Sequence, residues 1–396
     1  MSGVEAALAG PSATGPPEAA PPTGAGQATP PLTGAGQAAS ARSAGDPGPA
    51  STPTASELLL EMLAIPSPTG SEWRLAAALR ERLSALGFDA EIDPAGSVVA
   101  TWGDGRREVM LLGHLDTVPG SIAVRREAGR IHGRGAVDAK GPLAAALAAV
   151  LRQPRDGAAR YTVVGCVDEE GDSRGARQVA TRPSPSDLVV LEPSGWDAVT
   201  VGYRGIVRAE LRLEDAVRHR AAPPPTVADR MVALLAALQA ELAERNSGLT
   251  PFHCTDLRVT GLEVIGTGLT ETAAAVIQLR LPPGLPPASL LDWLDARRGA
   301  AELLVQFAVD AVHTPRDSRP ARALTRAIRR HGGTPRHKVK TGTADMNLLV
   351  PRWGCPAVAY GPGDSHLDHT PDESVEVAEL ERGADILAGA LGELSR

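Results

Sequence analysis

Apolar and polar positions alternate with two different periods along the chain, and each period predicts a type of element. Short apolar runs that end in polar residues predict four strands, at residues 108–113, 161–168, 187–192 and 355–361. Helical patterns at residues 142–151 and 174–181 lie between the first three of them. This order predicts an α/β fold with a doubly wound, largely parallel sheet and helices on both faces. In such sheets, ligands bind at the carboxyl ends of the strands.

Between residues 207 and 313 the pattern changes. A strand (207–213), a helix (227–244), two strands (257–265 and 272–281), a helix (288–297) and a strand (303–309) follow in order. The order βαββαβ is that of a ferredoxin-like domain. We therefore predict a second domain at residues 207–313, inserted between the two parts of the first domain, residues 56–206 and 314–396.

Residues 1–55 differ in composition from the rest of the chain. They hold 10 of the 34 prolines but few charged residues, and the hexapeptide TGAGQA occurs twice in them. Because such a segment cannot bury a core, we predict a disordered, low-complexity tail. The residues Thr54 to Glu57 form a capping-box pattern at the start of a first helix, and residues 72–86 predict a second, amphipathic helix.

Charge and composition argue against several classes of protein. The formal net charge of −7 argues against a nucleic-acid binder, which needs a basic surface. The sequence has no run of about 18 apolar residues, so we expect no membrane span. The cysteines Cys166, Cys254 and Cys355 are scattered and show neither disulfide nor metal-binding spacing. They suit a protein of the reducing cytoplasm.

Candidate metal ligands follow the predicted strands. His114 and Asp116 come directly after the strand at 108–113, where an imidazole nitrogen can bind a metal and a nearby carboxylate can orient the ring. Asp138 lies in the glycine-rich segment GRGAVDAKG, just before a predicted helix. Each pattern alone also fits a structural role, a hydrogen-bonded histidine at a strand end or a turn residue before a helix. Neither is decisive by itself.

Adjacent acids follow the strand at 161–168. Glu169 and Glu170 repel each other unless a cation neutralises one of them or one is protonated. Beside a metal, one carboxylate can bind while its neighbour acts as a general base; otherwise both are solvated loop acids. Glu192 and His369 add two further candidates. Together these segments offer histidines and carboxylates but no cysteine, which suits Zn²⁺, Co²⁺ or Mn²⁺.

Six motifs in this order carry a family resemblance: GHLDTVP, GRGAVDAKG, VDEEG, LEPS, GTADMN and HTPDE. The chain resembles the ArgE/DapE/LysK group of dinuclear zinc amidohydrolases and exopeptidases, family 20 of the metallopeptidases. The resemblance implies a zinc-exopeptidase-like fold with a ferredoxin-like lid or dimerisation domain. It also implies two Zn²⁺ or Co²⁺ ions per subunit. One would be bound by His114, Asp138 and Glu192, and the other by Asp138, Glu170 and His369.

The same resemblance implies catalytic roles and an amide-hydrolysing activity. A hydroxide that bridges the metals would attack the amide, with Glu169 as the general base and Asp116 orienting His114. A lid histidine, sometimes supplied across a homodimer, would stabilise the oxyanion. His219 lies where that histidine is expected, but the prolines at 223–225 depart from the family pattern, so a plain surface histidine is the alternative.

The segments GYRG (202–205) and KTGTADMN (340–347) resemble the LysK-type branch in particular. Those enzymes release lysine or ornithine from an acidic amino-group carrier protein of the LysW type. The resemblance suggests Lys340 and Thr343 as substrate-binding residues. Asn347 replaces an arginine of many relatives, and Arg204 is our substitute carboxylate binder, with hinge packing as the alternative.

Two other classes of function remain open on the sequence alone. A small acyl amino acid could be the substrate, as in acetylornithine or succinyl-diaminopimelate deacylases or in dipeptidases. A metal-stabilised binding protein is a further alternative, although a purely structural site needs no spare base such as Glu169. Residues 316–340 hold nine Lys or Arg against one acid, and four arginines (322, 326, 329 and 330) share one helix face. That face either docks an acidic carrier or is an ordinary solvated surface.

Overall fold

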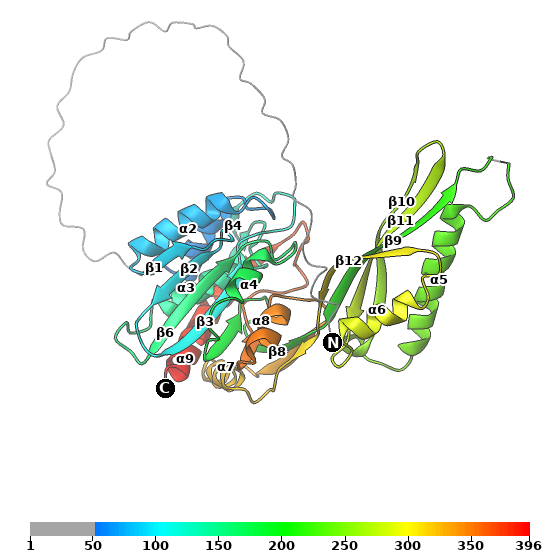
Figure 1. Cartoon of the computed structure of the whole chain (residues 1–396). Coiled ribbons are helices and arrows are strands. Elements are labelled where there is room, and N and C mark those ends of the chain that lie inside the picture. Colours follow the sequence, from blue (N-terminus) through cyan, green and yellow to red (C-terminus); the bar gives the residue numbers. More distant parts are fainter. Residues whose placement is uncertain (1–51, 220) are drawn as a thin grey trace, which may run out of the picture. The chain divides into compact units, whose positions relative to one another are not determined.

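The computed structural model describes residues 52–219 and 221–396, and all that follows concerns these residues. They form a mixed α/β structure with an additional antiparallel sheet (Figure 1). The predicted tail, residues 1–55, lies outside the described residues except for its last four. Among the described helices, none is both long and apolar enough to span a bilayer.

The helices are α1 (Ala55–Leu63), α2 (Trp73–Ala85), α3 (Lys140–Val150), α4 (Arg174–Val179), α5 (Val227–Arg245), η1 (Pro251–His253), α6 (Pro287–Asp295), α7 (Arg319–Arg330), α8 (Met346–Trp353) and α9 (Val377–Leu394). The strands are β1 (Asp89–Ile92), β2 (Val98–Trp102), β3 (Arg107–His114), β4 (Arg125–Glu127), β5 (Arg130–His132), β6 (Ala159–Cys166), β7 (Asp187–Val190), β8 (Ala198–Tyr203), β9 (Gly205–Ala216), β10 (Asp256–Gly266), β11 (Thr270–Leu281), β12 (Glu302–Val309), β13 (Val312–His313), β14 (Arg336–Lys340), β15 (Ala357–Ala359) and β16 (Ser374–Glu376).

The main sheet has the order β1-β2-β6-β3-β7-β15-β8-β13, and β14 pairs with β8. Its centre, β6-β3-β7-β15, is parallel, as the sequence predicts. Towards the ends, the pairs of β1 with β2, β2 with β6 and β8 with β13 are antiparallel, so the sheet is mixed rather than largely parallel. A short turn, which only an antiparallel pair allows, joins β1 to β2, and β13 follows the additional sheet directly.

Helices cover both faces of this sheet. The helices α1, α3, α7 and α9 share one apolar core with it, and α4 and α8 pack on the opposite face. All residues of α3 are buried, because α1 and α9 enclose it against the sheet. This explains its run of small residues, PLAAALAAV, since close packing on several sides leaves little room for larger ones.

The additional sheet has the order β10-β11-β9-β12 and forms the element order βαββαβ that the sequence predicts. Helices α5 and α6 cover one of its faces and share a separate apolar core with it. We call this part, β9 to β12, the lid. Its exact limits as a domain, and those of the two flanking parts, stay a prediction.

Candidate metal centre

Three central strands bring chemically active residues to one edge of the main sheet. Strand β3 lies between β6 and β7 and is parallel to both, with His114 opposite Cys166 and Leu112 opposite Val190. The segments that follow these strands therefore meet at their carboxyl ends. They supply His114, the Glu169–Glu170 pair and Glu192, as the sequence predicts for neighbouring parallel strands.

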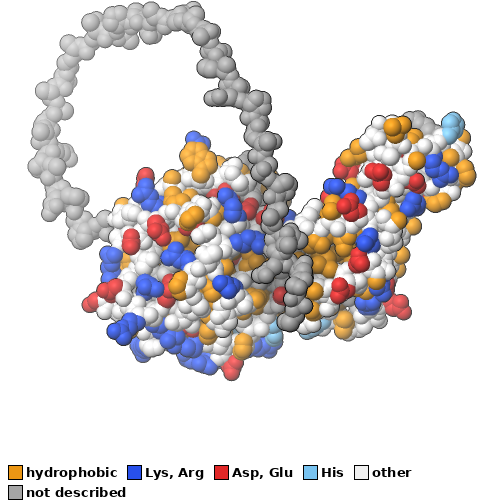
Figure 2. Space-filling view, viewed as in Figure 1, with side chains coloured by type: hydrophobic (Ala, Val, Ile, Leu, Met, Phe, Trp, Pro, Cys, Tyr) orange, Lys and Arg blue, Asp and Glu red, His pale blue; other side chains and the backbone are white. Residues whose placement is uncertain are grey.

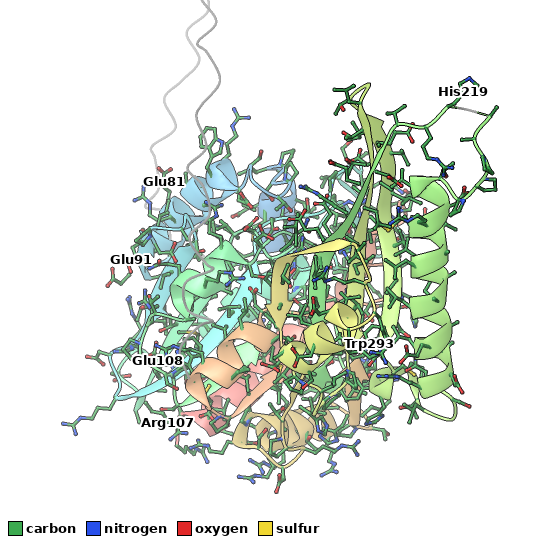
Figure 3. The ribbon with its side chains drawn as sticks, turned by 45° about the vertical axis from the view of Figure 1, so that its right-hand side comes forward. Glu81, Glu91, Arg107, Glu108, His219 and Trp293 are labelled. Carbon is green, nitrogen blue, oxygen red and sulfur yellow. The ribbon has the colours of Figure 1, made fainter. Side chains whose placement is uncertain are left out.

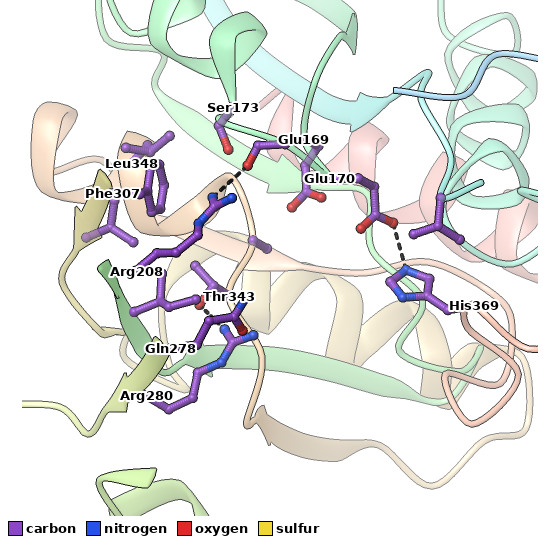
Figure 4. Close-up of a pocket in the computed structure, with 15 residues that line it drawn as sticks. Glu169, Glu170, Ser173, Arg208, Gln278, Arg280, Phe307, Thr343, Leu348 and His369 are labelled. Carbon is purple, nitrogen blue, oxygen red and sulfur yellow. Dashed lines mark hydrogen bonds and ion pairs between the residues drawn. The ribbon is translucent and has the colours of Figure 1, made fainter. Parts of the chain in front are cut away.

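Two loops complete the cluster. Asp138 lies in the loop before α3, where its peptide bond to Ala139 is cis. His369 follows β15 and has a positive φ of 63°. The Asp138 carboxylate lies between the two histidines, with Oδ1 3.2 Å from Nε2 of His114 and Oδ2 2.9 Å from Nε2 of His369. The same nitrogen of His369 lies 2.7 Å from Oε1 of Glu170 (Figure 4).

The cluster contains two groups of potential metal donors that share Asp138. One is His114, Asp138 and Glu192, and the other is Asp138, Glu170 and His369; within each group the donor atoms lie within 4.8 Å of one another. These are the two ligand sets that the family resemblance implies. Their arrangement, with one shared carboxylate and a mixture of imidazole and carboxylate donors, fits two divalent cations of the zinc or cobalt type. A third group joins His114 to both Glu169 and Glu170.

Electrostatics also favour positive charge at this place. Burial, followed by the charge of Asp138, raises the pKa of Glu192 to about 7. Burial likewise raises the pKa of Glu169 well above its usual range. Hydrogen bonds with Asp138 and Glu170 raise the pKa of His369 to about 10. So many buried carboxyl groups can ionise together only beside protonated imidazoles or bound cations, which is what a dinuclear metal site provides.

Asp116 contacts both His114 and the backbone of the Glu169–Glu170 pair. Its backbone carbonyl oxygen lies 2.9 Å from Nδ1 of His114, and its carboxylate is 3.5 Å from the same atom. That carboxylate also accepts hydrogen bonds from the backbone N–H groups of Glu169 (3.1 Å) and Glu170 (3.0 Å). Asp116 is fully buried. It therefore fixes the ring of His114 and the strand end that carries both glutamates relative to each other.

Glu373 is a positioning residue that the sequence analysis did not single out. Its Oε1 accepts hydrogen bonds from three backbone N–H groups of the Asp138 loop, those of Gly135 (3.0 Å), Val137 (3.0 Å) and Asp138 itself (3.1 Å). Its Oε2 accepts one from Arg134 at 2.8 Å. Because Glu373 lies four residues after His369, it ties the two loops of the cluster together.

Glu373→Ala is therefore expected to weaken metal binding by about 10- to 100-fold, the usual effect of losing an outer partner of a metal ligand. Three buried N–H groups would also lose their acceptor, which costs about 3 kcal/mol or more of unfolding free energy. Calorimetric metal titration and urea unfolding measure the two effects. Glu376→Ala is the matched control, because Glu376 is exposed and should change neither quantity. Unchanged metal affinity in Glu373→Ala would contradict this role.

A pocket of about 370 Å³ adjoins the cluster and is lined by Glu169, Glu170 and His369 on one side and by lid residues on the other (Figure 4). Two lid arginines face it, Arg208 on β9 and Arg280 on β11. Burial, followed by the charges of Arg204 and Arg258, lowers the pKa of Arg280 to about 10. Among the described residues, Arg280 donates a hydrogen bond to Oγ1 of Thr343 at 2.5 Å and pairs with no carboxylate.

Arg208 has a similar position. Its Nη2 donates to the backbone oxygen of Gly171 at 3.0 Å and, unlike Arg280, also forms an ion pair with Oδ1 of Asp172 at 3.4 Å. Its guanidinium lies 5.3 Å from the ring centre of Phe307. Its Nε is buried and has no partner in the described part of the chain. Two such cations beside a pocket favour an anionic ligand group. The sequence analysis missed both arginines, because alternation along a lid strand does not show which face the main domain adjoins.

The predicted substrate-binding residues fall in different places. Thr343 lines the pocket. Burial raises the pKa values of Glu192 and Asp368, and the positive charge of Lys340 lowers them. Lys340 therefore acts on the electrostatics of the cluster. Arg204 is almost fully buried and bonds to Asp256 Oδ2 (2.6 Å) and to backbone oxygens of residues 341 and 254. These contacts show that Arg204 packs the hinge, the segment 202–205 between the main sheet and the lid. Arg204 does not line the pocket.

Asn347 and His219 have no contact with the cluster in the described residues. Asn347 is buried, and its side chain donates hydrogen bonds to the backbone oxygens of Arg204 (3.2 Å) and Asp310 (2.7 Å). It therefore stabilises the hinge. His219 is exposed in the loop between β9 and α5, at the outer end of the lid (Figure 3). Its Nδ1 accepts a hydrogen bond from the backbone N–H of Ala221 at 3.1 Å.

Comparison with known proteins assigns the family. The model of "Peptidase family M20/M25/M40" matches residues 110–393, which include all five proposed metal ligands. The chain belongs to this family. Its fold class and its enzymatic nature, a hydrolase of amide or peptide bonds, follow from this membership, as does the binding of divalent metal.

Relatives of this M20/M25/M40 peptidase carry more specific names. The chain is 42% identical over 352 residues to a LysW-lysine hydrolase of Deinococcus radiodurans, covering 86% of this chain and 97% of that protein. It is 28% identical over 325 residues to a LysW-lysine/LysW-ornithine hydrolase of Sulfurisphaera tokodaii, covering 82% and 91%.

Two solved structures show the same fold. An M20 family metallo-carboxypeptidase of Sulfolobus solfataricus matches this M20/M25/M40 peptidase with a TM-score of 0.69 and 19% identity, over 86% of this chain and 99% of that one. A tripeptidase of Staphylococcus aureus matches with a TM-score of 0.70 and 18% identity, over 87% and 98%. At these identities the likeness concerns the fold alone.

Proposed function

We propose that this protein releases lysine or ornithine from an acidic amino-group carrier protein of the LysW type by hydrolysing the amide bond between them. The observation that carries the proposal is the 42% identity, over nearly the whole described chain, to a relative named LysW-lysine hydrolase. The second relative, named for both lysine and ornithine, supports the pair of amino acids.

The cluster supplies the residues that such a reaction needs. His114, Asp138 and Glu192 would hold one divalent cation and Asp138, Glu170 and His369 the other, with Zn²⁺ or Co²⁺ as the metals that suit these donors. When bound, two such ions polarise the scissile carbonyl group and make water a stronger nucleophile at neutral pH. Asp116 holds His114 and the Glu169–Glu170 segment in place.

Glu169 has the position of a general base. It lines the pocket beside the cluster but belongs to neither ligand set that shares Asp138. It takes a proton from the attacking water and passes it to the nitrogen of the departing amino acid. Burial raises the pKa of Glu169 above its usual range, and the charge of Glu192 adds to this effect.

Arg280 is proposed to bind a carboxylate of the substrate. A half-buried cation without an acidic partner among the described residues favours an anion in the pocket, and the released amino acid carries one. We expect Arg280→Gln to lower kcat/KM by about 30-fold, the effect of losing about 2 kcal/mol from a buried charge pair. Steady-state kinetics measure the change. Arg245→Gln, at the exposed end of α5, is the control and should keep normal kinetics; equal losses in both variants would exclude a specific role for Arg280.

Homodimerisation is a further part of the proposal. Four apolar residues of β10 are exposed along one edge of the lid sheet: Val259, Leu262, Val264 and Ile265. Pairing of two lids would cover them. His219, at the outer end of the lid, would then serve the site of the second subunit, as the family resemblance implies.

A cytoplasmic localisation is also part of the proposal, and the cysteine pattern supports it.

The experiment that tests the proposal compares substrates. We expect metal-loaded protein to hydrolyse a carrier protein γ-linked to lysine or ornithine in strong preference to N-acetylornithine and N-succinyl-diaminopimelate. Turnover of the free acyl amino acids alone would exclude the carrier-linked reaction and favour the deacylase alternative.

A further inference from the structure

Strand β14 forms an open edge of the main sheet. It pairs with β8 alone, and in the described part of the chain no strand pairs with its other side. The backbone N–H of Arg336 donates to Asp197, and the backbone oxygen of Lys340 accepts from Arg204, so these residues direct their backbone groups towards the sheet. Backbone groups alternate in direction along a strand, so those of residues 337 and 339 face outwards and can pair with an added extended chain.

The side chains of this strand form a row of cations. Arg336, Lys338 and Lys340 are alternate residues and therefore lie on one face of β14. With a rise of about 3.3 Å per residue, the row spans about 13 Å. Val339, on the other face, is partly exposed.

This row leads to the metal cluster. Arg336 forms an ion pair with Asp197, and Nζ of Lys338 donates to the backbone oxygen of Ser194 at 2.7 Å. Lys340, the last of the three, lies three residues before Thr343, which lines the pocket beside the cluster. The cations thus follow the segment from residue 197 back to residue 194, which lies two residues after the proposed metal ligand Glu192. In the described residues, no hydrogen-bond acceptor contacts the ammonium of Lys340.

We propose that the outer edge of β14, with the cations Arg336, Lys338 and Lys340, docks an extended acidic segment of the carrier protein next to the residue that bears the scissile amide. The proposal rests on the proposed function. Added strands gain affinity from backbone hydrogen bonds and specificity from side-chain pairs, and opposite charges side by side on neighbouring strands stabilise the pairing. Lysines also protect edge strands from unwanted pairing, but protection alone does not require a row that leads to the catalytic cluster.

Helix α7 is less suited to this docking than β14. Figure 2 shows Lys and Arg side chains gathered at the lower edge of the main body, where Figure 1 places α7. Two of its four aligned arginines, Arg326 and Arg330, form ion pairs with Glu393 of α9. Arg336 of β14 is likewise paired, with Asp197, so ion pairing does not separate the two surfaces. Their positions do, because nothing in the described residues connects α7 to the cluster, whereas Lys338 of β14 contacts Ser194, two residues after Glu192.

A peptide-binding experiment tests the docking surface directly. The probe is a fluorescein-labelled eight-residue peptide with four glutamates, compared with the same peptide carrying glutamine in their place. Fluorescence polarisation with the full-length, metal-loaded protein should show tighter binding of the acidic peptide. Equal binding of the two peptides, or none, would overturn the proposal.

Two variants act on the edge in different ways. Val339→Pro removes one outward N–H without changing charge, and proline is tolerated on the free side of an edge strand. Lys338→Glu reverses one charge of the row. Each should weaken binding of the acidic peptide by about tenfold, as loss of a complementary charge or of strand pairing predicts. Arg322→Glu, on α7, is the control and should bind normally; thermal unfolding confirms that each variant is folded.

Turnover then separates this proposal from the proposed function. In the two β14 variants, KM for the carrier-linked substrate should rise about tenfold with kcat unchanged, while KM for a small acyl amino acid should stay the same. Hydrolysis of the carrier-linked substrate with unaltered KM in both variants would overturn the docking surface and leave the function intact. Normal peptide binding without any hydrolysis of carrier-linked lysine or ornithine would refute the function and leave the docking surface intact.

Discussion

Glu169→Gln is expected to lower kcat by about 10²- to 10⁴-fold, the usual contribution of a general base. Glutamine has nearly the same shape but cannot accept the proton of the attacking water. The loss should appear in kcat and kcat/KM together, because Glu169 acts in the transition state rather than in substrate binding. Stopped-flow or steady-state hydrolysis of a carrier-linked substrate measures it.

The same variant should keep its metals and its fold. Glu169 lies outside both ligand sets that share Asp138, and its backbone N–H, which Asp116 holds, is unchanged. Metal analysis after dialysis should therefore match the wild type. If Glu169→Gln loses one metal together with its activity, Glu169 is a ligand, as the third donor group would allow, and a different residue must be the base.

Asp138→Asn is expected to abolish both activity and tight metal binding. Its carboxylate is the only member of both proposed ligand sets and lies within hydrogen-bonding distance of both histidines. The amide is neutral and cannot bind two cations through two equivalent oxygens. The loss of metal affinity should exceed the about 10- to 100-fold effect of removing an outer partner such as Glu373. Calorimetric titration with Zn²⁺ or Co²⁺ measures it.

The comparison of Asp138→Asn with Glu169→Gln separates metal binding from proton transfer. The Asp138→Asn substitution should leave the backbone loop intact, because Glu373 holds that loop through N–H groups that the substitution keeps. Retention of two tightly bound metals in Asp138→Asn would contradict the bridging role.

Strand ends were the part of the site that the sequence could predict. His114, Glu169, Glu170 and Glu192 follow apolar runs, and parallel pairing of those runs brings their ends together by geometry alone. Asp138 and His369 lie in loops; their residue types made them candidates, but only the family resemblance assigned them to two ligand sets. The link between these loops is the set of hydrogen bonds that the Glu373 carboxylate accepts from residues more than 230 positions away. No local pattern reveals such a contact.

The missed elements have equally physical reasons. Strand β8 is short and continues almost directly into β9, so the sequence analysis did not predict it as a separate strand. Strand β14 is rich in basic residues, and its basic residues resembled a continuation of the α7 charge pattern. Arg204 was our substitute for the arginine that Asn347 replaces in the family motif, but its burial against Asp256 shows a packing role. Arg208 and Arg280 matter through their position across the pocket, which only the tertiary structure defines.

The central claim is a dinuclear hydrolase that acts on carrier-linked lysine or ornithine, and titrating the metal-free protein with Co²⁺ or Zn²⁺ tests it most directly. Hydrolysis of the carrier-linked substrate is measured at each addition. The account predicts that activity rises until two equivalents of metal per chain are bound. Full rate then requires both metals and the carrier-linked lysine or ornithine as substrate. Full activity with one equivalent would contradict the shared Asp138 site. No hydrolysis of the carrier-linked substrate at any metal content would contradict the function itself.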